Sequence, residues 1–226
     1  MQENNARQNT MAGIERTASV LETNKVLRNT YMLLGMTLLA TAAASGLAII
    51  LNLPPLAAIV CMIASFIMIF VVNKTADSAK GIGMIFIFSI LMGMSLGPML
   101  QIYLKMANGP SIVFQAFAGT ALIFFSLSAY ALTTRKDFSF MGGFLMVGMI
   151  VALVAIVANI FLHIPVLSLT ISAVVILLMS GLILFDTSRI IHGGETNYIR
   201  ATISLYLNIY NIFVHLLSIL GIANDD

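Results

Sequence analysis

The chain has 226 residues, of which 60% are hydrophobic and only 9% are charged, whereas roughly 25% of the residues in an ordinary soluble domain are charged. This composition excludes a water-soluble globule. The 11 Lys and Arg residues exceed the 9 Asp and Glu residues by only two, so no nucleic acid is expected as a partner. The single cysteine, Cys61, excludes a disulfide framework or a thiolate metal site within one chain.

Seven apolar runs are long enough to cross a membrane as helices, which need about 20 apolar residues each. Every charged side chain lies outside these runs, and their unbroken apolar character excludes a β-barrel, whose strands alternate apolar with polar residues. We therefore predict an all-α polytopic membrane protein, with the lipid bilayer around a seven-helix domain at residues 24–222. The predicted spans are Thr30–Leu51, Pro55–Val72, Gly81–Leu104, Ser111–Leu132, Phe140–Leu162, Val166–Phe185 and Ala201–Ile222.

The distribution of the basic residues predicts the orientation. Lys and Arg in short loops are retained on the cytoplasmic side of a membrane. With the N-terminus inside, ten of the eleven Lys and Arg residues fall on the inner side, and only Lys105 falls outside. We expect a cytoplasmic N-terminus and a periplasmic C-terminus, with residues 223–226 as a short external tail.

Residues 1–23 differ from the rest of the chain in composition. They are rich in Gln, Asn, Thr and Arg and have no sustained apolar period, so they cannot bury enough surface to offset the entropy of ordering. We predict a disordered cytoplasmic tail that begins at Met1 and includes Arg7 and Arg16.

The third predicted span contains an irregular segment. Gly93 and Gly97 form a small-xxx-small face that lets another helix approach closely, and Pro98 removes a backbone donor directly after it. Both a packing seam and a hinge fit these residues.

The seventh predicted span carries a polar stripe. Its five members follow spacings of 4, 3, 4 and 3 residues and so share one helix face: Ser204, Asn208, Asn211, His215 and Ser218. Such a face must meet other helices or a watered cavity, so we predict that this helix is central in the bundle. Interhelical hydrogen bonding and a conduit or switch remain alternative roles for the stripe.

Asp186 is the carboxylate nearest to the apolar runs. If its helix continues to Ile191 before Gly193 and Gly194 break it, Asp186 lies about a turn and a half inside the helix end. Burial and the nearby Arg189 act on its protonation in opposite senses. Two interpretations stay open: a helix end paired with Arg189, or a proton-sensitive latch.

Enzymatic activity is not expected. An aspartyl intramembrane protease needs two carboxylates that converge on one water, and only Asp186 approaches an embedded position. His192 and His215 would be ~35 Å apart in a continuous helix, so they cannot share a metal ion. No metal site and no cofactor are predicted.

Four segments resemble the Bax inhibitor-1 (transmembrane BAX inhibitor motif) family, and specifically its bacterial branch. They are NKVLRNTYMLL from Asn24, LTTRKDFSFMGG from Leu132, VANIFLHIP from Val157, and FDTSRIIHGGETNYIRATISLYLNIYNIFVHLLSILG from Phe185. The resemblance extends from about Asn24 to Gly221. It implies a seven-helix bundle in the bacterial inner membrane with the last helix near its centre.

The bacterial branch implies a first function, the modulation of FtsH, a membrane-anchored AAA+ protease. On this hypothesis the protein binds FtsH and restrains its attack on other membrane proteins. The tail, with Met1, Arg7 and Arg16, would then be offered to the protease as a slow or competing substrate.

The wider family implies a second function, a pH-sensitive leak for a cation such as calcium. In that mechanism two aspartates, one in the sixth helix and one in the seventh, share a proton. Asp186 matches the first position, but Asn208 occupies the second, which leaves only one titratable site. On this hypothesis Arg189, Asn211 and His215 complete the proton switch or ion path.

The depths of Asp186 and Asn208 in the membrane are a second argument against the leak hypothesis. Regular helices place Asp186 and Asn208 at depths that differ by ~7 Å, so contact between them would need tilt or unwinding. A purely structural membrane scaffold is the third class of function considered.

Overall fold

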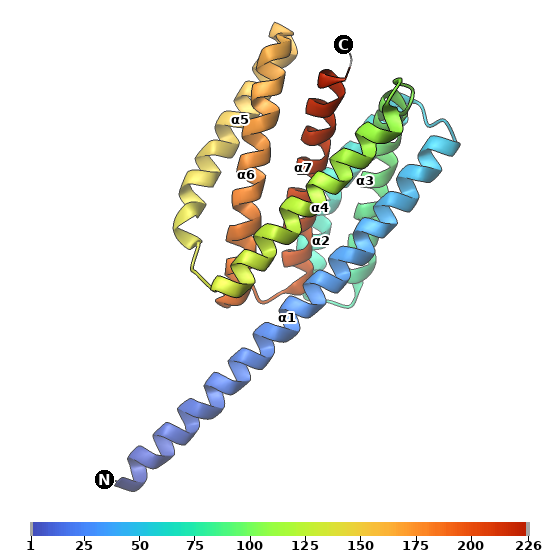
Figure 1. Ribbon diagram of the computed structural model, residues 1–226. Helices are drawn as coiled ribbons and strands as arrows, with labels where there is room; N and C mark the ends of the chain where they lie inside the picture. The colour runs from blue at the N-terminus through green and yellow to red at the C-terminus, as the bar shows by residue number, and fades with distance from the viewer. Residues whose placement is uncertain (1, 225–226) are drawn as a thin grey trace.

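The computed structural model describes the backbone of residues 2–224 and the side chains of residues 23–224. Residues 2–224 form seven α-helices and one 3₁₀ turn, with no strand among them (Figure 1). The elements are α1 (Gln2–Ile50), α2 (Pro55–Thr75), α3 (Lys80–Leu104), α4 (Gly109–Thr134), η1 (Ser139–Met141), α5 (Gly142–Leu162), α6 (Pro165–Ile191) and α7 (Tyr198–Ala223).

The predicted seven-span architecture is confirmed, because all seven helices are long and apolar enough to cross a membrane. Several predicted spans are shorter than the helices observed. α6 continues six residues beyond Phe185, and α7 begins at Tyr198 rather than Ala201. The predicted spans were ended at the first charged residue. A helix, however, ends where its terminal backbone groups find capping partners.

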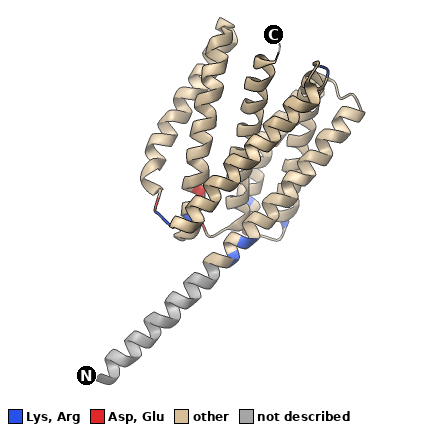
Figure 2. Cartoon of the chain, viewed as in Figure 1, with Lys and Arg blue, Asp and Glu red and all other residues tan. Residues whose placement is uncertain are grey.

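Basic residues gather at one end of the bundle (Figure 2). We call it the basic end; it comprises the start of α1 and the α2–α3, α4–α5 and α6–α7 connections. Its described cations are Lys25, Arg28, Lys74, Lys80, Arg135, Lys136, Arg189 and Arg200, whereas Lys105 follows α3 at the other end. α1 begins and α7 finishes at opposite ends (Figure 1). Which end is cytoplasmic stays a prediction.

The seventh helix is central, as predicted. α7 packs against α1, α2, α3, α4 and α6. No residue from Asn197 to Gly221 is exposed, and Leu205, Tyr206 and Ile212 are almost completely buried. In contrast, α5 packs only on α6 and η1 among the described elements and exposes most of its surface.

Gly93 and Gly97 form a packing seam between α1 and α3. A methyl group added to Gly93 would lie 2.8 Å from the Cβ of Ala44, and Gly97 faces Ser45 and Ala48 of the same helix. α3 passes through Pro98 and remains helical to Leu104. The structure thus favours the seam over the hinge.

The start of α1 coincides with the predicted N-terminal tail. α1 begins at Gln2, whereas disorder is predicted for residues 1–23. No side chain before Thr23 is described. Met1 therefore lies outside the described residues, the side chains of Arg7 and Arg16 are not described, and the disordered tail stays a prediction.

Candidate functional site

Asp186 lies inside α6, near the basic end. The helix continues to Ile191, and Gly193 then adopts φ 75°, so the predicted end of this helix is confirmed. At 1.5 Å per residue, Asp186 lies ~8 Å inside the end of the helix. Its side chain is only 7% exposed. A carboxylate so far removed from solvent requires polar partners.

Two donors from α7 bind one oxygen of Asp186. The Ser204 hydroxyl donates to Oδ2 at 2.7 Å, and the Asn208 Nδ2 donates to the same atom at 2.8 Å. Ser204 and Asn208 lie one turn apart on α7. The polar stripe therefore meets α6 through these two residues, and Asp186 and Asn208 are in contact.

The Asp186–Asn208 contact forms without unwinding, because α6 and α7 are both continuous at these residues. Side chains in an α-helix lean toward the N-terminus of their own helix. α6 ends at the basic end and α7 starts there, so Asp186 leans away from that end and Asn208 leans toward it. The two leans help to bridge the ~7 Å difference in depth expected from regular helices. Of the two routes to contact that were considered, tilt or unwinding, unwinding is not observed at these residues.

Arg189 does not pair with Asp186. Its Nη2 donates to the carbonyl of Gly194 at 3.1 Å, and its guanidinium lies 5.6 Å from the centroid of the Phe185 ring. The guanidinium thus binds a loop carbonyl just beyond the end of α6, where the helix dipole favours a cation. Of the two interpretations of Asp186, the Arg-paired helix end is not the arrangement observed.

Farther from the basic end, His215 and Asn211 have different partners. His215 shares a hydrogen bond with Ser172 of α6, with 3.1 Å between Nδ1 and Oγ. The Asn211 Nδ2 instead donates to the Leu207 carbonyl of its own helix at 2.8 Å. Among the residues whose side chains are described, this face of α7 therefore carries three that bind α6 and one, Asn211, that bonds only within α7.

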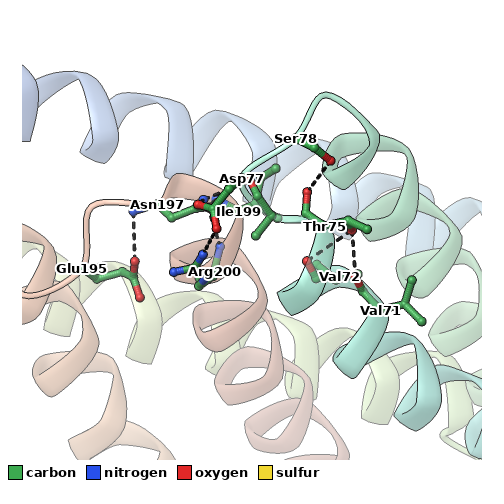
Figure 3. Close-up of polar contacts among 10 residues, drawn as sticks. Val71, Val72, Thr75, Asp77, Ser78, Glu195, Asn197, Ile199 and Arg200 are labelled. Atoms are coloured by element: carbon green, nitrogen blue, oxygen red, sulfur yellow. Dashed lines mark hydrogen bonds and ion pairs between the residues drawn. The ribbon is translucent and has the colours of Figure 1, made fainter.

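A second polar cluster joins the α2–α3 turn to the start of α7 (Figure 3). The Asn197 Nδ2 donates to the Ala76 carbonyl at 2.9 Å and to Asp77 Oδ1 at 2.8 Å, and Arg200 forms an ion pair with Asp77 Oδ2. We call Asp77, Asn197 and Arg200 the loop clasp. The loop clasp was not predicted from the sequence, although Asn before an apolar run is a helix N-cap signal.

Asn197 also caps α7. Its Oδ1 accepts the backbone N–H groups of Ile199 at 2.9 Å and Arg200 at 3.2 Å. A side-chain oxygen at this position satisfies donors that have no partner within the helix. The same residue thus starts α7 and attaches it to the turn after α2.

The α4–α5 connection is attached to α6 in a similar way. The backbone N–H of Phe138 donates to the Ser188 hydroxyl at 3.0 Å. Within the connection, the Ser139 hydroxyl and backbone N–H both donate to Asp137 Oδ1, at 2.5 and 2.8 Å. These two bonds hold the pKa of the exposed Asp137 carboxyl below its ordinary value. The connection therefore holds its position beside the end of α6.

A cavity of about 270 Å³ reaches Asp186 from the basic end. α2 contributes Ile69 and Asn73 to its lining, and α6 contributes Asp186 and Arg189. The other polar residues of the lining are Glu195, Arg200 and Ser204. Glu195 is a second carboxylate of the same cavity, which the sequence analysis did not identify because Glu195 lies in the loop after Gly193 and Gly194.

The Asp186 cluster can hold a proton or a cation at Oδ1, because both neutral donors bind the other oxygen, Oδ2. Among the described residues, no donor reaches Oδ1. Asn208 rather than an acid completes the pair, so the cluster has one titratable group. No group of three or more His, Cys, Asp and Glu residues in the described part of the chain is placed to hold a metal ion.

Comparison with known proteins adds a family assignment to this geometry. The sequence model of the family described as "Inhibitor of apoptosis-promoting Bax1" matches residues 23–225. This range includes all seven spans, the Asp186 cluster and the loop clasp.

Three relatives match nearly the whole chain. Over 208 residues the chain is 53% identical to the protein named "Modulator of FtsH protease YccA" from Escherichia coli, covering 92% of this chain and 94% of that protein. A protein from another Escherichia coli strain, named "Inner membrane protein YccA", has the same identity over the same shares. An uncharacterised membrane protein of Vibrio cholerae is 50% identical over 216 residues, which are 95% of this chain and 96% of the relative.

Proposed function

Because this chain belongs to the Bax inhibitor-1 family, we propose that it is a multi-pass protein of the bacterial inner membrane that modulates the protease FtsH. One observation carries the proposal: the high identity to the Escherichia coli modulator extends over almost the full length of both proteins. Seven helices able to cross a membrane agree with a site of action beside a membrane-anchored protease.

The N-terminal tail is proposed as the segment that FtsH engages. A flexible tail of about 25 residues has a root-mean-square reach of ~25 to 30 Å, which is enough to meet a neighbouring ATPase ring. Met1, Arg7 and Arg16 belong to this segment. The tail would occupy the protease as a slow or competing substrate, and the protein itself would act without catalysis.

Copurification tests the partner and the tail together. The full chain and a version without residues 1–23 are expressed in membranes that contain FtsH, extracted in detergent and purified. We expect FtsH to copurify with the full chain, and the truncated version to lose restraint of FtsH toward other membrane substrates. Absence of FtsH from the purified full chain, with unchanged substrate turnover after deletion of the gene, would contradict the proposal.

The cation leak is placed second, as the function to exclude. Asp186, with Arg189, Asn208, Asn211 and His215, would form its proton switch or ion path, and the cavity beside Asp186 is the observation in its favour. However, the position of the second acid holds Asn208. Flux of calcium into proteoliposomes, compared between the wild-type protein and Asp186→Asn, separates the two functions: absence of flux in both proteins excludes the leak.

A further inference from the structure

The central helix is not covered on all sides. α2 and α6 both pack on α7, but among the described residues no Cα atom of α2 lies within 8 Å of a Cα atom of α6. α7 therefore forms the floor between two helices that do not meet. At the basic end this space is the cavity described above, with Ile69 of α2, Ile190 of α6 and Leu207 of α7 in its lining. We call the whole space the α2–α6 groove.

Asn211 lies beyond the lining of the cavity, toward the middle of α7, and follows the lining residue Leu207 along the helix. It lies four residues after Leu207 and so on the same helix face, and its side chain is half-buried. Its Nδ2 donates to the Leu207 carbonyl, which already belongs to the hydrogen-bond ladder of the helix. No other hydrogen bond of Asn211 occurs among the residues described. One amide hydrogen and the amide oxygen are thus left for an external partner.

The depth of Asn211 restricts what that partner can be. Asn211 lies ~20 Å from the start of α7, halfway along the helix, so the groove is at the level of the acyl chains. Hydrocarbon provides neither a donor nor an acceptor to an amide. Asn208, one turn nearer the basic end, shows the contrast, because it is buried and bound to Asp186.

We propose that the α2–α6 groove binds a transmembrane helix of the protease partner, through hydrogen bonds between Asn211 and a Ser, Thr, Asn or Gln side chain of that helix. Amide groups of this kind join transmembrane helices, and a small polar residue on the incoming helix supplies both the donor and the acceptor that Asn211 lacks. The inference rests on the proposed function and adds a surface inside the membrane to the contact made by the tail.

Photo-cross-linking from single cysteines tests the groove. Cys61 is the only cysteine, so Cys61→Ala gives a background without thiols. Leu207→Cys and Asn211→Cys place a benzophenone maleimide on the groove floor. Leu122→Cys on α4 and Val154→Cys on α5, at positions 69% and 60% exposed, place it on other faces as matched controls. In membranes that contain FtsH, we expect adducts with FtsH from the two groove positions and few from the controls.

Copurification of Asn211→Leu provides the second measurement. Because the Asn211 side chain bonds only its own helix within residues 23–224, we expect the variant to unfold at the wild-type temperature. The recovered FtsH is expected to fall about three- to tenfold, which corresponds to the loss of one or two interhelical hydrogen bonds. Asn211→Gln, which keeps the amide, is expected to retain more FtsH than Asn211→Leu.

The outcomes distinguish this inference from the function on which it rests. If FtsH copurifies equally with wild type and Asn211→Leu, and cross-links only to the control faces, the groove inference fails and the proposed function stands. Adducts only with a second copy of this chain, or only with lipid, would also overturn the groove inference. Labelling of Asn211→Cys by a membrane-impermeant maleimide would overturn it as well, since each result identifies a different occupant. If FtsH never copurifies, the proposed function fails as well.

Discussion

Two asparagines of α7 have the same chemistry and different surroundings. Asn208 is buried and donates to a carboxylate of another helix, whereas the half-buried Asn211 donates to its own backbone. The stripe that contains both was predictable, because helical periodicity fixes which residues share a face. The partner of each residue was not predictable, because it depends on how far α6 is rotated about its axis and how closely α2 approaches.

Replacement of Asn208 by Leu is expected to destabilise the protein. The change removes one of the two donors to a carboxylate that is almost completely buried, at a cost of ~1–3 kcal/mol. Thermal unfolding in detergent measures the loss. The double variant Asp186→Leu with Asn208→Leu is expected to lose less stability than Asn208→Leu alone, because it leaves no buried charge without its donor.

Asn211→Leu is the matched control for that experiment. It removes a hydrogen bond within one helix, so its effect on stability is expected to stay within about 0.5 kcal/mol. A variant Asn208→Leu as stable as Asn211→Leu would show that the Asp186–Asn208 contact does not stabilise the fold.

At the scale of the helices, the seam between α1 and α3 and the loop clasp determine how the elements fit. The glycines of the seam were visible in the sequence as a small-xxx-small pattern, although the sequence did not identify α1 as the partner. The loop clasp joins residues about 120 positions apart, and no local pattern reports such a pairing. Of the three residues of the loop clasp, only Asn197 could be identified from the local sequence, as the N-cap of α7.

Gly93→Ala is expected to destabilise the seam. The added methyl group meets the Cβ of Ala44 at 2.8 Å and also approaches the backbone of Thr41, so α1 must shift, at a cost of ~1–3 kcal/mol. Gly83→Ala, in the same helix, is the control, because no atom lies within 4 Å of its added carbon. That variant is expected to be neutral or stabilising by up to ~1 kcal/mol. Equal unfolding temperatures for the two variants would argue against close packing at Gly93.

Asn197→Ala is expected to weaken the α7 terminus more than Asp77→Asn does. The first change removes a helix cap, worth ~0.5–2 kcal/mol, together with the bonds to the α2–α3 turn. The second removes only an ion pair whose side chains are 38% and 73% exposed, and such surface pairs contribute ~0–1 kcal/mol that salt screens. Unfolding measured at low and high salt should show salt dependence for the pair and little for the cap. The opposite ranking would contradict the capping role of Asn197.

For the whole molecule, composition and hydropathy predicted the number of helices and the central position of α7. The long apolar runs have no soluble alternative, and a helix with a polar face must be sheltered in a bilayer. The helix boundaries were less predictable, because several helices extend past their apolar runs and include charged residues. The predicted orientation rests on the basic residues alone.

Single-cysteine labelling in the Cys61→Ala background tests the orientation. Ser78→Cys lies in the α2–α3 turn of the basic end, and Asn108→Cys lies in the α3–α4 connection at the other end; both positions are exposed. With eight described cations at the basic end, we expect that end to be cytoplasmic. A membrane-impermeant maleimide added to spheroplasts should therefore label Asn108→Cys and leave Ser78→Cys unlabelled until the membrane is opened. The reverse pattern would invert the topology.

The central place of α7 affects how the protein is made. Chains grow from the N-terminus, so α7 leaves the ribosome after the helices on which it packs. Thr202 of α7 donates to the carbonyl of Thr30, 172 residues earlier in the chain. Until α7 is inserted, the earlier helices lie in the bilayer without the helix that their inner faces contact. A product that stops before Tyr198 lacks the helix on which α1, α2, α3, α4 and α6 all pack, so the inner faces of those helices stay uncovered.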